Sequence, residues 1–483
     1  MGLLDFFKKL KNGIKAGVSI MKSTEFEEGE FNQERILYLI SSFNNSERRN
    51  WMSIGQQYYD VENDILNRKM IKIVDGVEVE ESYKANNKIA HAKYKNMVDE
   101  KIGYLLSKPY SLKCDNKEYI EKVKKALGKN FGYILAGLGY EASNKGIAWL
   151  QVYVDEKGKF RTMIIPSEQC IPVWKDNSHM ELESMIRKYD KEIWFGSTLK
   201  TISIVEVWTE TGVNYYKYES GMLIPEINKN EDENGPIAHY KRNNEWVGWG
   251  KVPFIAFKNN RREYPDIKYV KTLCDQYDKS RSEASNFIEE VKNLIYVLKG
   301  YGGEDINEFM RSLNENRAIF IDDPEDGGVE TLTPEMNIDV LKEHYEQLKR
   351  DLIEDGQSVN KDLDKFGSAP SGVALSFMYS GLDLKANALE NEFKMGFENI
   401  LYFINQYIKA SSSEDVELVL NRDMKMNESE VIANCGNSKG IISDETIIAN
   451  HPWVKDVEKE EEKLKNQKKE SIPYQDKVPL EEE

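Results

Sequence analysis

Few residues in this sequence have the types and spacing that chemistry requires, and the first candidate is a glycine pattern. Gly137, Gly139 and Ala142 form G-x-G-x-x-A, the pattern of dinucleotide-binding turns. Such a turn must follow a strand and open a helix. Here residues 131–138 have a helical pattern, and a strand-like run begins only after Ala142. We therefore expect no nucleotide site at this position.

The sequence contains no recognisable metal site or catalytic motif. No histidine has a partner at metal-ligand spacing, and no Walker phosphate loop occurs. A run beginning at Asp322 resembles an EF-hand loop, but Pro324 takes the third ligand position and Thr333 replaces the closing Glu. We therefore expect no catalytic residue, no cofactor and no metal. The isolated histidines are His91, His179, His239, His344 and His451.

Composition and charge limit the class of protein. The 483 residues are 40% hydrophobic, which is enough for a substantial core and for two to four subdomains. The net charge of −17 argues against a protein that holds nucleic acid by neutralising many phosphates. A conduit through which a polyanion slides benefits from weakly repulsive walls, although an ordinary acidic protein carries the same charge. The four cysteines are far apart in sequence, so we expect free thiols in a reducing cytoplasm.

The N-terminal residues 1–30 contain the one basic amphipathic stretch. Leu3, Phe6 and Leu10 can share a helical face opposite several lysines, which is typical of an interfacial helix or of a segment that docks on a neighbouring subunit. Two glycines weaken the helix, and Phe6 does not fit the N-myristoylation pattern. We expect docking and no stable membrane association. No apolar run is long enough to span a bilayer, and no signal-peptide pattern occurs.

Three long amphipathic segments between Tyr264 and Lys409 organise the chain. Each has apolar residues at three- and four-residue steps, which predicts helices that pack lengthwise. The stripes are Val270, Leu273, Tyr277, Ala284, Phe287, Val291 and Leu294; Ile338, Leu341, Tyr345, Leu348 and Leu352; and Leu375, Phe377, Leu382, Leu389, Phe393, Phe397, Ile400, Ile404 and Tyr407.

Two interruptions separate these helices. Residues 299–335 contain their own turn signals, a short helical piece at 306–313 and a strand-like run, which predicts a small inserted lobe. Residues 356–372 contain three glycines, one proline and several small polar residues, so the chain must leave the helical conformation there. Ser371 is then suited to cap the third helix.

The rest of the chain has helical, strand-like and charged parts. Residues 32–60 predict two helices separated near Asn44, and residues 87–107 predict a third. Asp75-Gly76 predicts a hairpin over residues 71–80. Residues 146–258 contain short β-branched and aromatic runs, which predict an antiparallel β-rich subdomain. Towards the C-terminus we expect a short strand at 416–420, a helix from Ser443 to Asn450, a charged helix opening at Pro452 and a disordered tail.

Four stretches in this order resemble the portal proteins of tailed bacteriophages, over roughly residues 32–464. They are IIPSEQCIPVW from Ile164, YVKTLCDQYDKSRSEASNFIEEV from Tyr269, FGSAPSGVALSFMYSGLDLKA from Phe366 and ISDETIIANHPWVKDVEKEEEKL from Ile442. The resemblance implies an α+β, portal-like fold, with long stem helices flanking a small inserted clip lobe, a β-rich wing subdomain and a helical C-terminal crown.

The implied subdomains follow the chain. They are an N-terminal amphipathic segment (1–30), the helical part of the wing (31–145), the β-rich wing subdomain (146–262), the first stem helix (263–298), the clip (299–335), the second stem helix (336–358), the channel or tunnel loop (359–372), the long wing helix (373–410), the crown (411–464) and a disordered tail (465–483).

The resemblance also implies the function and the partners. Portal proteins form a ring, usually a dodecamer, at one capsid vertex, and DNA is packaged and ejected through the channel. The implied partners are other copies of the chain, double-stranded DNA bound without sequence specificity, the terminase large subunit, the major capsid and scaffolding proteins, and a head-completion or tail adaptor protein. The chain would be a virion component that assembles in the host cytoplasm. Since it has no nucleotide loop, the packaging ATPase would be another protein.

Two groups of residues are candidates for contact with DNA. In the loop, Lys361 and Lys365 are the only cations and Phe366 is the only aromatic residue. By resemblance this loop, which includes Asn360 and Ser368, faces the channel; by composition alone it is merely flexible. Phosphate contacts of isolated lysines would be weak and independent of sequence, as sliding requires.

The second group is the acidic stem. Residues 335–357 contain seven acidic and three basic residues, and 266–290 contain six and four. If these helices line a channel, Glu343, Glu346, Glu354 and Asp355 present negative charge to DNA. Solvated faces of surface helices would have the same composition.

Other interpretations remain open. Another phage ring or adaptor protein, from a connector or baseplate, would share the acidity and the long helices but not the order of helix, insert, helix and loop. A nucleic-acid-processing enzyme without a recognisable motif is the third alternative. Trp246 and Trp249 could stack on bases, but we expect them to pack at a sheet edge.

Overall fold

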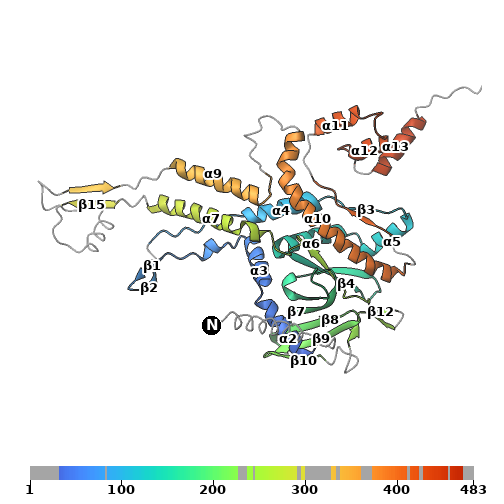
Figure 1. Cartoon of the computed structure of the whole chain (residues 1–483), viewed down its shortest axis with the longest axis horizontal. Coiled ribbons are helices and arrows are strands. Elements are labelled where there is room, and N and C mark those ends of the chain that lie inside the picture. Colours follow the sequence, from blue (N-terminus) through green and yellow to red (C-terminus); the bar gives the residue numbers. More distant parts are fainter. Residues whose placement is uncertain are drawn as a thin grey trace, which may run out of the picture. The chain divides into compact units, whose positions relative to one another are not determined.

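The structure is a computed structural model of the whole chain (Figure 1). It describes residues 32–81, 84–226, 236–242, 245–290, 295–299, 328–332, 338–359, 372–410, 414–423, 428–454 and 457–470. These divide into two compact units. The first unit comprises the described residues within 1–50, 149–255 and 403–410, and the second those within 51–148, 256–402 and 411–483. The expected mixture of helices and sheets is confirmed.

The first unit is built around antiparallel sheets. One has the strand order β10-β9-β8-β7-β6, with β11 also paired to β9, and another has the order β14-β4-β5. The β-branched and aromatic runs predicted within residues 146–258 form strands, but the long strand β7 was not predicted because its outer half is charged and exposed. The elements are α2 (Gln33–Asn44), β4 (Ile147–Val154), β5 (Phe160–Ile165), β6 (Cys170–Trp174), β7 (Leu182–Phe195), β8 (Thr198–Trp208), β9 (Gly212–Glu219), β10 (Met222–Pro225), β11 (Ile237–Ala238), β12 (Tyr240–Arg242), β13 (Glu245–Val247), β14 (Phe254–Lys258) and a 3-10 turn at Ser167–Gln169.

Helix α2 covers one face of the larger sheet. Ile36 and Ile40, one turn apart, are buried against strand residues such as Ile186 and Val205. Asn32 caps the helix by accepting a hydrogen bond from the N–H of Arg35. The predicted separation near Asn44 is confirmed, since α3 (Glu47–Tyr59) begins three residues later.

The second unit contains the long helices. Its elements are the 3-10 turn at Asp64–Asn67, β1 (Ile71–Val74), β2 (Val77–Glu80), α4 (Lys93–Leu106), β3 (Ser111–Lys113), α5 (Lys117–Leu127), α6 (Phe131–Lys145), α7 (Ile267–Glu290), β15 (Ile295–Lys299), β16 (Gly328–Leu332), α9 (Ile338–Asp355), α10 (Gly372–Ile408), β17 (Glu417–Val419), α11 (Glu428–Asn437), α12 (Asp444–Asn450) and α13 (Val457–Glu470). The three predicted long helices correspond to α7, α9 and α10.

Aromatic side chains fill the core of the second unit. The rings of Phe257 and Phe393 are 5.0 Å apart, and those of Phe131 and Phe397 are 6.3 Å apart. Gly396 allows the close approach of α10, because a Cβ atom there would lie 2.7 Å from the ring of Phe257. The predicted stripe of α10 is buried from Leu382 to Ile404, but Tyr407 is only partly buried and Phe377 is 74% exposed.

Helix α4 begins later than expected. Residues 87–91, which we call the strap, are extended instead of helical. The strap runs along α7, because the backbone N–H groups of Asn87, Ile89 and His91 donate to side chains of that helix. The acceptors are Asn286 (2.6 Å), Ser282 (3.0 Å) and Asp278 (3.1 Å). Partners distant in sequence thus satisfy a backbone that local periodicity assigned to a helix.

The buried face of α7 also differs from the prediction. Leu273, Tyr277 and Phe287 of the predicted stripe are only half-buried, whereas Asp278, Ser282 and Asn286 are buried. The strap explains this, since it covers the polar face. The helix ends at Glu290, and residues 295–298, which we expected at its end, belong to strand β15, which pairs with β16.

Several local predictions are confirmed. The hairpin β1–β2 turns at Asp75 and Gly76, both with positive φ. Ser443 caps α12 through the N–H of Thr446, and β17 pairs with β3. The charged helix is present as α13, but the prediction that it opens at Pro452 is wrong, because Pro452 lies in a turn and the helix begins at Val457. The disordered tail predicted for 465–483 is wrong for residues 465–470, which belong to α13. The predicted features at 1–30, 306–313, 371 and 471–483 lie outside the described residues.

Candidate functional site

Helices α7 and α9 lie side by side and are joined by polar contacts (Figure 1). The Tyr345 hydroxyl donates to the carbonyl oxygen of Ser280 at 3.0 Å, and His344 Nε2 lies 3.2 Å from the Ser280 hydroxyl. Leu348 and Leu352, from the predicted stripe of α9, are buried. One side of α9 is therefore committed to packing.

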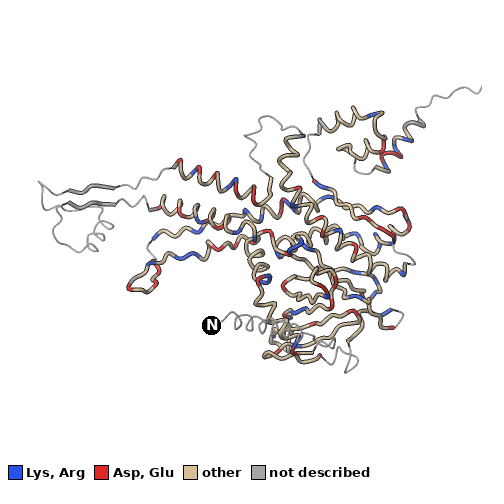
Figure 2. Tube along the Cα trace, in the orientation of Figure 1, with Lys and Arg blue, Asp and Glu red and all other residues tan. Residues whose placement is uncertain are grey.

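The remaining surface of α9 carries more acidic than basic residues (Figure 2). The four residues predicted to line a channel are all exposed and belong to one helix: Glu343, Glu346, Glu354 and Asp355. Glu346 has a partner within α9, since its carboxylate lies 3.8 Å from Lys349 Nζ. Such an exposed pair contributes little to stability, so the face remains open to electrostatic interaction with a polyanion.

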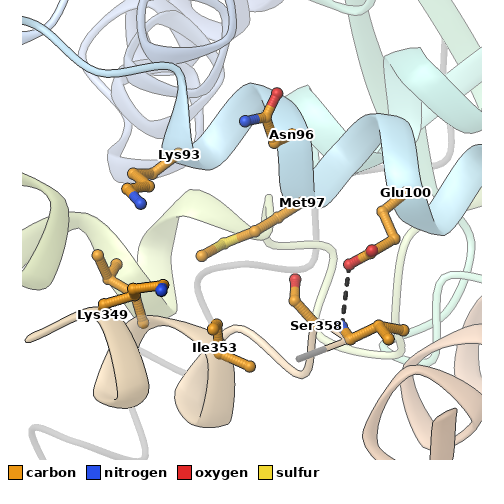
Figure 3. Close-up of a pocket in the computed structure, with 9 residues that line it drawn as sticks. Lys93, Asn96, Met97, Glu100, Lys349, Ile353 and Ser358 are labelled. Carbon is orange, nitrogen blue, oxygen red and sulfur yellow. Dashed lines mark hydrogen bonds between the residues drawn. The ribbon is translucent and has the colours of Figure 1, made fainter. Parts of the chain in front are cut away.

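The predicted DNA-contact loop follows α9 directly. Asn360, Lys361, Lys365, Phe366 and Ser368 lie outside the described residues. The residues that lead into the loop are fixed, however. The N–H of Val359 donates to Glu100 Oε2 of α4 at 3.0 Å, as the dashed line in Figure 3 shows. Lys385 Nζ of α10 donates to the carbonyl oxygen of Gly356 at 3.1 Å. The loop therefore starts from a point held by two other helices.

Gly356 is required at this point for steric reasons. A Cβ atom there would lie 2.8 Å from Met97 Sδ and 2.5 Å from the carbonyl oxygen of Leu352. Any larger residue would push the end of α9 away from α4. The glycine, which the sequence indicates only as a helix breaker, thus also permits close packing.

Lys385 belongs to a buried ion cluster, which we call the hub. Its Nζ atom lies 3.3 Å from Asp266, just before α7, and Lys101 of α4 lies 2.6 Å from the same carboxylate. Asn259 completes the hub by accepting from Lys101 at 2.7 Å and donating to Asp266 at 2.8 Å. The hub joins the beginning of α7 to α4, α10 and the end of α9.

Burial and charge set the protonation of the hub. Burial alone would raise the pKa of Asp266, but Lys101 and Lys385 outweigh it and lower the pKa to about 2. Burial lowers the pKa of Lys101 to about 8, against the attraction of Asp266. Sequence reasoning missed the hub. A signal existed, because Lys101 interrupts the apolar stripe of α4 between Val98 and Leu105.

A cavity of about 170 Å³ lies beside the start of the loop (Figure 3). Met97 of α4 and Ile353 of α9 give it an apolar wall, and Lys93 and Lys349 contribute ammonium groups from the two helices. It is too small for a nucleotide-sized ligand, since ligand pockets have volumes of roughly 300–1,000 Å³.

The remaining candidate residues have structural roles in the described part of the chain. Gly137 and Gly139 lie within α6, so the turn that a dinucleotide needs is not formed there. Trp249 is buried against Tyr240 and Phe403, as expected for packing, whereas Trp246 is exposed beneath Lys241. All four cysteines are free thiols.

Metal and membrane features were searched among the same described residues. No group of three or more His, Cys, Asp or Glu side chains there is arranged to hold a metal ion. Likewise, none of the helices described has the length and apolar character needed to cross a membrane.

Comparisons with known proteins identify relatives over most of the chain. The family model described as phage portal protein, SPP1 Gp6-like, matches residues 44–474. The portal protein of Bacillus phage SPP1 is 34% identical over 416 residues, which are 84% of this chain and 81% of that protein. The portal protein of Clostridium phage phiCD119 is 31% identical over 450 residues, which are 90% of this chain and 96% of that protein.

The solved structures that are similar to the chain match it less closely. A chain from the neck of a native GTA particle, computed with C12 symmetry, has a TM-score of 0.37 at 10% identity. The match covers 74% of this chain and 89% of that one.

Proposed function

The chain belongs to the family of SPP1 Gp6-like phage portal proteins, and we propose that its copies close into the ring through which DNA enters and leaves the capsid. It is a virion component at the capsid vertex. The observation that carries the proposal is the family match over residues 44–474, together with the long helices and acidic face that a conduit needs.

The acidic face of α9 would form part of the channel wall. A polyanion passes most easily along a surface that does not hold it, because bound phosphates would have to be released at every step. Glu343, Glu346, Glu354 and Asp355 are exposed and would repeat in every copy of the ring. A ring of many copies would therefore carry a much larger negative charge along its channel than one chain carries.

The loop after α9 would supply the few direct contacts with DNA. Lys361 and Lys365 would touch phosphates, and Phe366 would give the loop its apolar contact, with Asn360 and Ser368 beside them. The hydrogen bonds at Gly356 and Val359 support this role, since they give the loop a firm origin on α4 and α10. Isolated lysines on such a base would resist slippage without sequence preference.

The other parts of the chain receive roles by family membership. Helices α7 and α9 would be the stem, the segment between them the clip, the β-rich sheets part of the wing, and α11 to α13 the crown. The terminase large subunit, the major capsid and scaffolding proteins and a head-completion or tail adaptor would dock on the ring. The chain would supply no catalysis of its own.

Native mass spectrometry combined with class-averaged electron micrographs of the purified chain tests this function. The expected result is a closed ring of one defined copy number with a central hole. A chain that stays monomeric under every assembly condition, or forms open aggregates, contradicts the proposal.

A further inference from the structure

The cavity of about 170 Å³ between α4 and α9 is large enough for one six-membered ring. An engineered apolar cavity of about 150 Å³ in another protein holds a molecule of benzene. The wall is mostly apolar here as well. Its apolar residues are Met97, Leu352, Ile353 and Val359. A single phenyl group would therefore fill the space between the two helices.

Two ammonium groups line one end of this cavity. Lys93 is the first residue of α4 and Lys349 belongs to α9, and Figure 3 shows both on the same side of Met97. Glu100 lines the other end, where its carboxylate already accepts the N–H of Val359 at 3.0 Å. The cavity therefore has a cationic end, an apolar middle and an acidic end that is already hydrogen-bonded.

The contacts of the two lysines leave the cationic end positive. Lys93 Nζ lies over the Tyr277 ring, 4.6 Å from its centroid, and this ring carries no net charge. Lys349 Nζ lies 3.8 Å from the carboxylate of Glu346, whose side chain is 54% exposed. Such an exposed pair contributes little to stability, so exchange of one carboxylate for another would cost little. Two positive charges thus stand against one solvated carboxylate at this end.

These features together define the chemical class of a ligand. A carboxylate at the cationic end would accept charge-assisted hydrogen bonds, which are roughly twice as strong as those between neutral groups. An apolar group in the middle would remove the wall from water. Inorganic phosphate would satisfy the lysines but leave the wall wet, whereas an uncharged hydrocarbon would cover the wall and leave the lysines without an anion. Only a ligand with both groups fits the whole cavity.

We propose that this cavity is a binding site for a small carboxylate with one aromatic ring, which contacts Lys93 of α4 and Lys349 of α9 at once. The phenyl group would lie between Met97 and Ile353, which form two sides of the wall (Figure 3). The site contains residues of one chain only. It therefore needs no assembly of subunits and does not depend on the proposed function.

A bound ligand would affect the base of the loop. The chain just after α9 is attached to α4 through the hydrogen bond from Val359 to Glu100, and both residues line the cavity. A molecule that contacts both helices stabilises their closed arrangement, because it must leave before they separate. The cavity would therefore allow a small anion to stiffen the point from which the loop starts.

Titration of the purified protein with benzoate tests the site. Ligand-observed NMR should show saturable binding with a dissociation constant of about 1 mM or lower, as expected for so small a ligand. Benzylamine has the same aromatic ring but the opposite charge, and naphthoate has the same charge but two fused rings. Both should bind at least about tenfold more weakly than benzoate, because each fits only one feature of the cavity.

Three variants test the assignment to this cavity. Lys349→Gln removes one ammonium group and Ile353→Phe fills the space, so each should raise the dissociation constant for benzoate by about tenfold or more. Lys342→Gln removes the same charge from an exposed position of α9 that does not line the cavity, and it should bind benzoate as the unaltered protein does. Circular dichroism of each variant checks that the fold is kept.

Hydrogen exchange gives an independent measurement of where benzoate binds. At a concentration of about ten times its dissociation constant, the peptide covering 353–359 should exchange about tenfold more slowly, and a peptide covering α5 should be unchanged. Equal binding by the unaltered protein, Lys349→Gln and Ile353→Phe, or the absence of saturable binding, would overturn the site. Neither result changes the native mass spectrum, so failure of this inference and failure of the proposed function are distinguishable.

Discussion

Lys385 and Gly356 are joined by a hydrogen bond of 3.1 Å, from the lysine Nζ atom to the glycine carbonyl oxygen. The same Nζ atom lies 3.3 Å from Asp266. One side chain of α10 therefore links the residue where α9 ends to the buried carboxylate where α7 begins. The position of the loop base depends on an ion cluster that contains no loop residue.

Replacing Lys385 should loosen the loop base. In Lys385→Met the carbonyl oxygen of Gly356 loses this donor, and the end of α9 should open more often. Hydrogen exchange of the peptide covering 353–359 should become faster, at a stability cost of about 1–3 kcal/mol. Lys394→Met, on the same helix but in a partly exposed pair with Glu390, is the control and should leave this peptide unchanged.

Removing the carboxylate of the hub should lower the free energy of unfolding by more than Lys385→Met does. Asp266→Asn leaves two buried lysines without their counter-charge, so the free energy of unfolding should fall by about 3–5 kcal/mol. Denaturant unfolding measures it. A loss below 1 kcal/mol would show that the lysines are solvated and that the hub is not closed.

Acid should weaken the same cluster. The pKa of Asp266 is lowered to about 2 in the folded chain, so its contribution is complete above pH of about 4 and is lost as the pH falls towards 2. That contribution corresponds to about 2 kcal/mol. The pH dependence of unfolding between these values should be smaller in Asp266→Asn than in the unaltered protein.

A second pH effect should arise in the first unit. His239 stacks on Trp208 and accepts a hydrogen bond from the N–H of Trp249, and burial lowers its pKa to about 4. The unfolded chain binds a proton below pH of about 6.5, whereas the folded chain does so only near 4. Stability should therefore fall as the pH drops through this range. His239→Asn, which keeps an acceptor but does not titrate, should remove that part of the slope when unfolding is followed by tryptophan fluorescence.

The loop lysines can be tested without affecting assembly. Lys361→Glu/Lys365→Glu should impair DNA filling or retention while rings form normally, because only phosphate contacts are changed. Packaged DNA per particle is the measurement. Normal packaging and retention by this variant would reject a DNA role for both residues.

Neutralising the stem should have the opposite electrostatic effect. Glu343→Gln/Glu346→Gln/Glu354→Gln should make isolated rings retain DNA longer at low salt, and the difference should shrink as salt rises. The control is Glu118→Gln/Glu121→Gln/Glu210→Gln, which removes the same charge from exposed positions on α5 and after β8. Equal retention by the two triple variants would contradict a channel position for the α9 residues.

Short sequence patterns explain which features could be predicted. Asp75-Gly76 favours a tight turn, and Ser443 caps the helix that follows it. The spacing of the apolar residues from Leu382 to Ile404 predicts the buried face of α10. Residues 87–91 could not be predicted in the same way, because their hydrogen-bond partners lie on α7, about 190 residues later. The hub depends equally on distant residues. Its one local sign is a lysine within the apolar face of α4.

The antiparallel pairing of β15 and β16 has a consequence for how such a protein can diversify. Lys299 and Gly328 are ladder partners, so the chain leaves and rejoins this two-stranded sheet at neighbouring positions. Whatever length of polypeptide lies between these two residues, the distance between the end of α7 and the beginning of α9 stays the same. Exchange of that stretch for one of another length would therefore leave α7 and α9 unchanged.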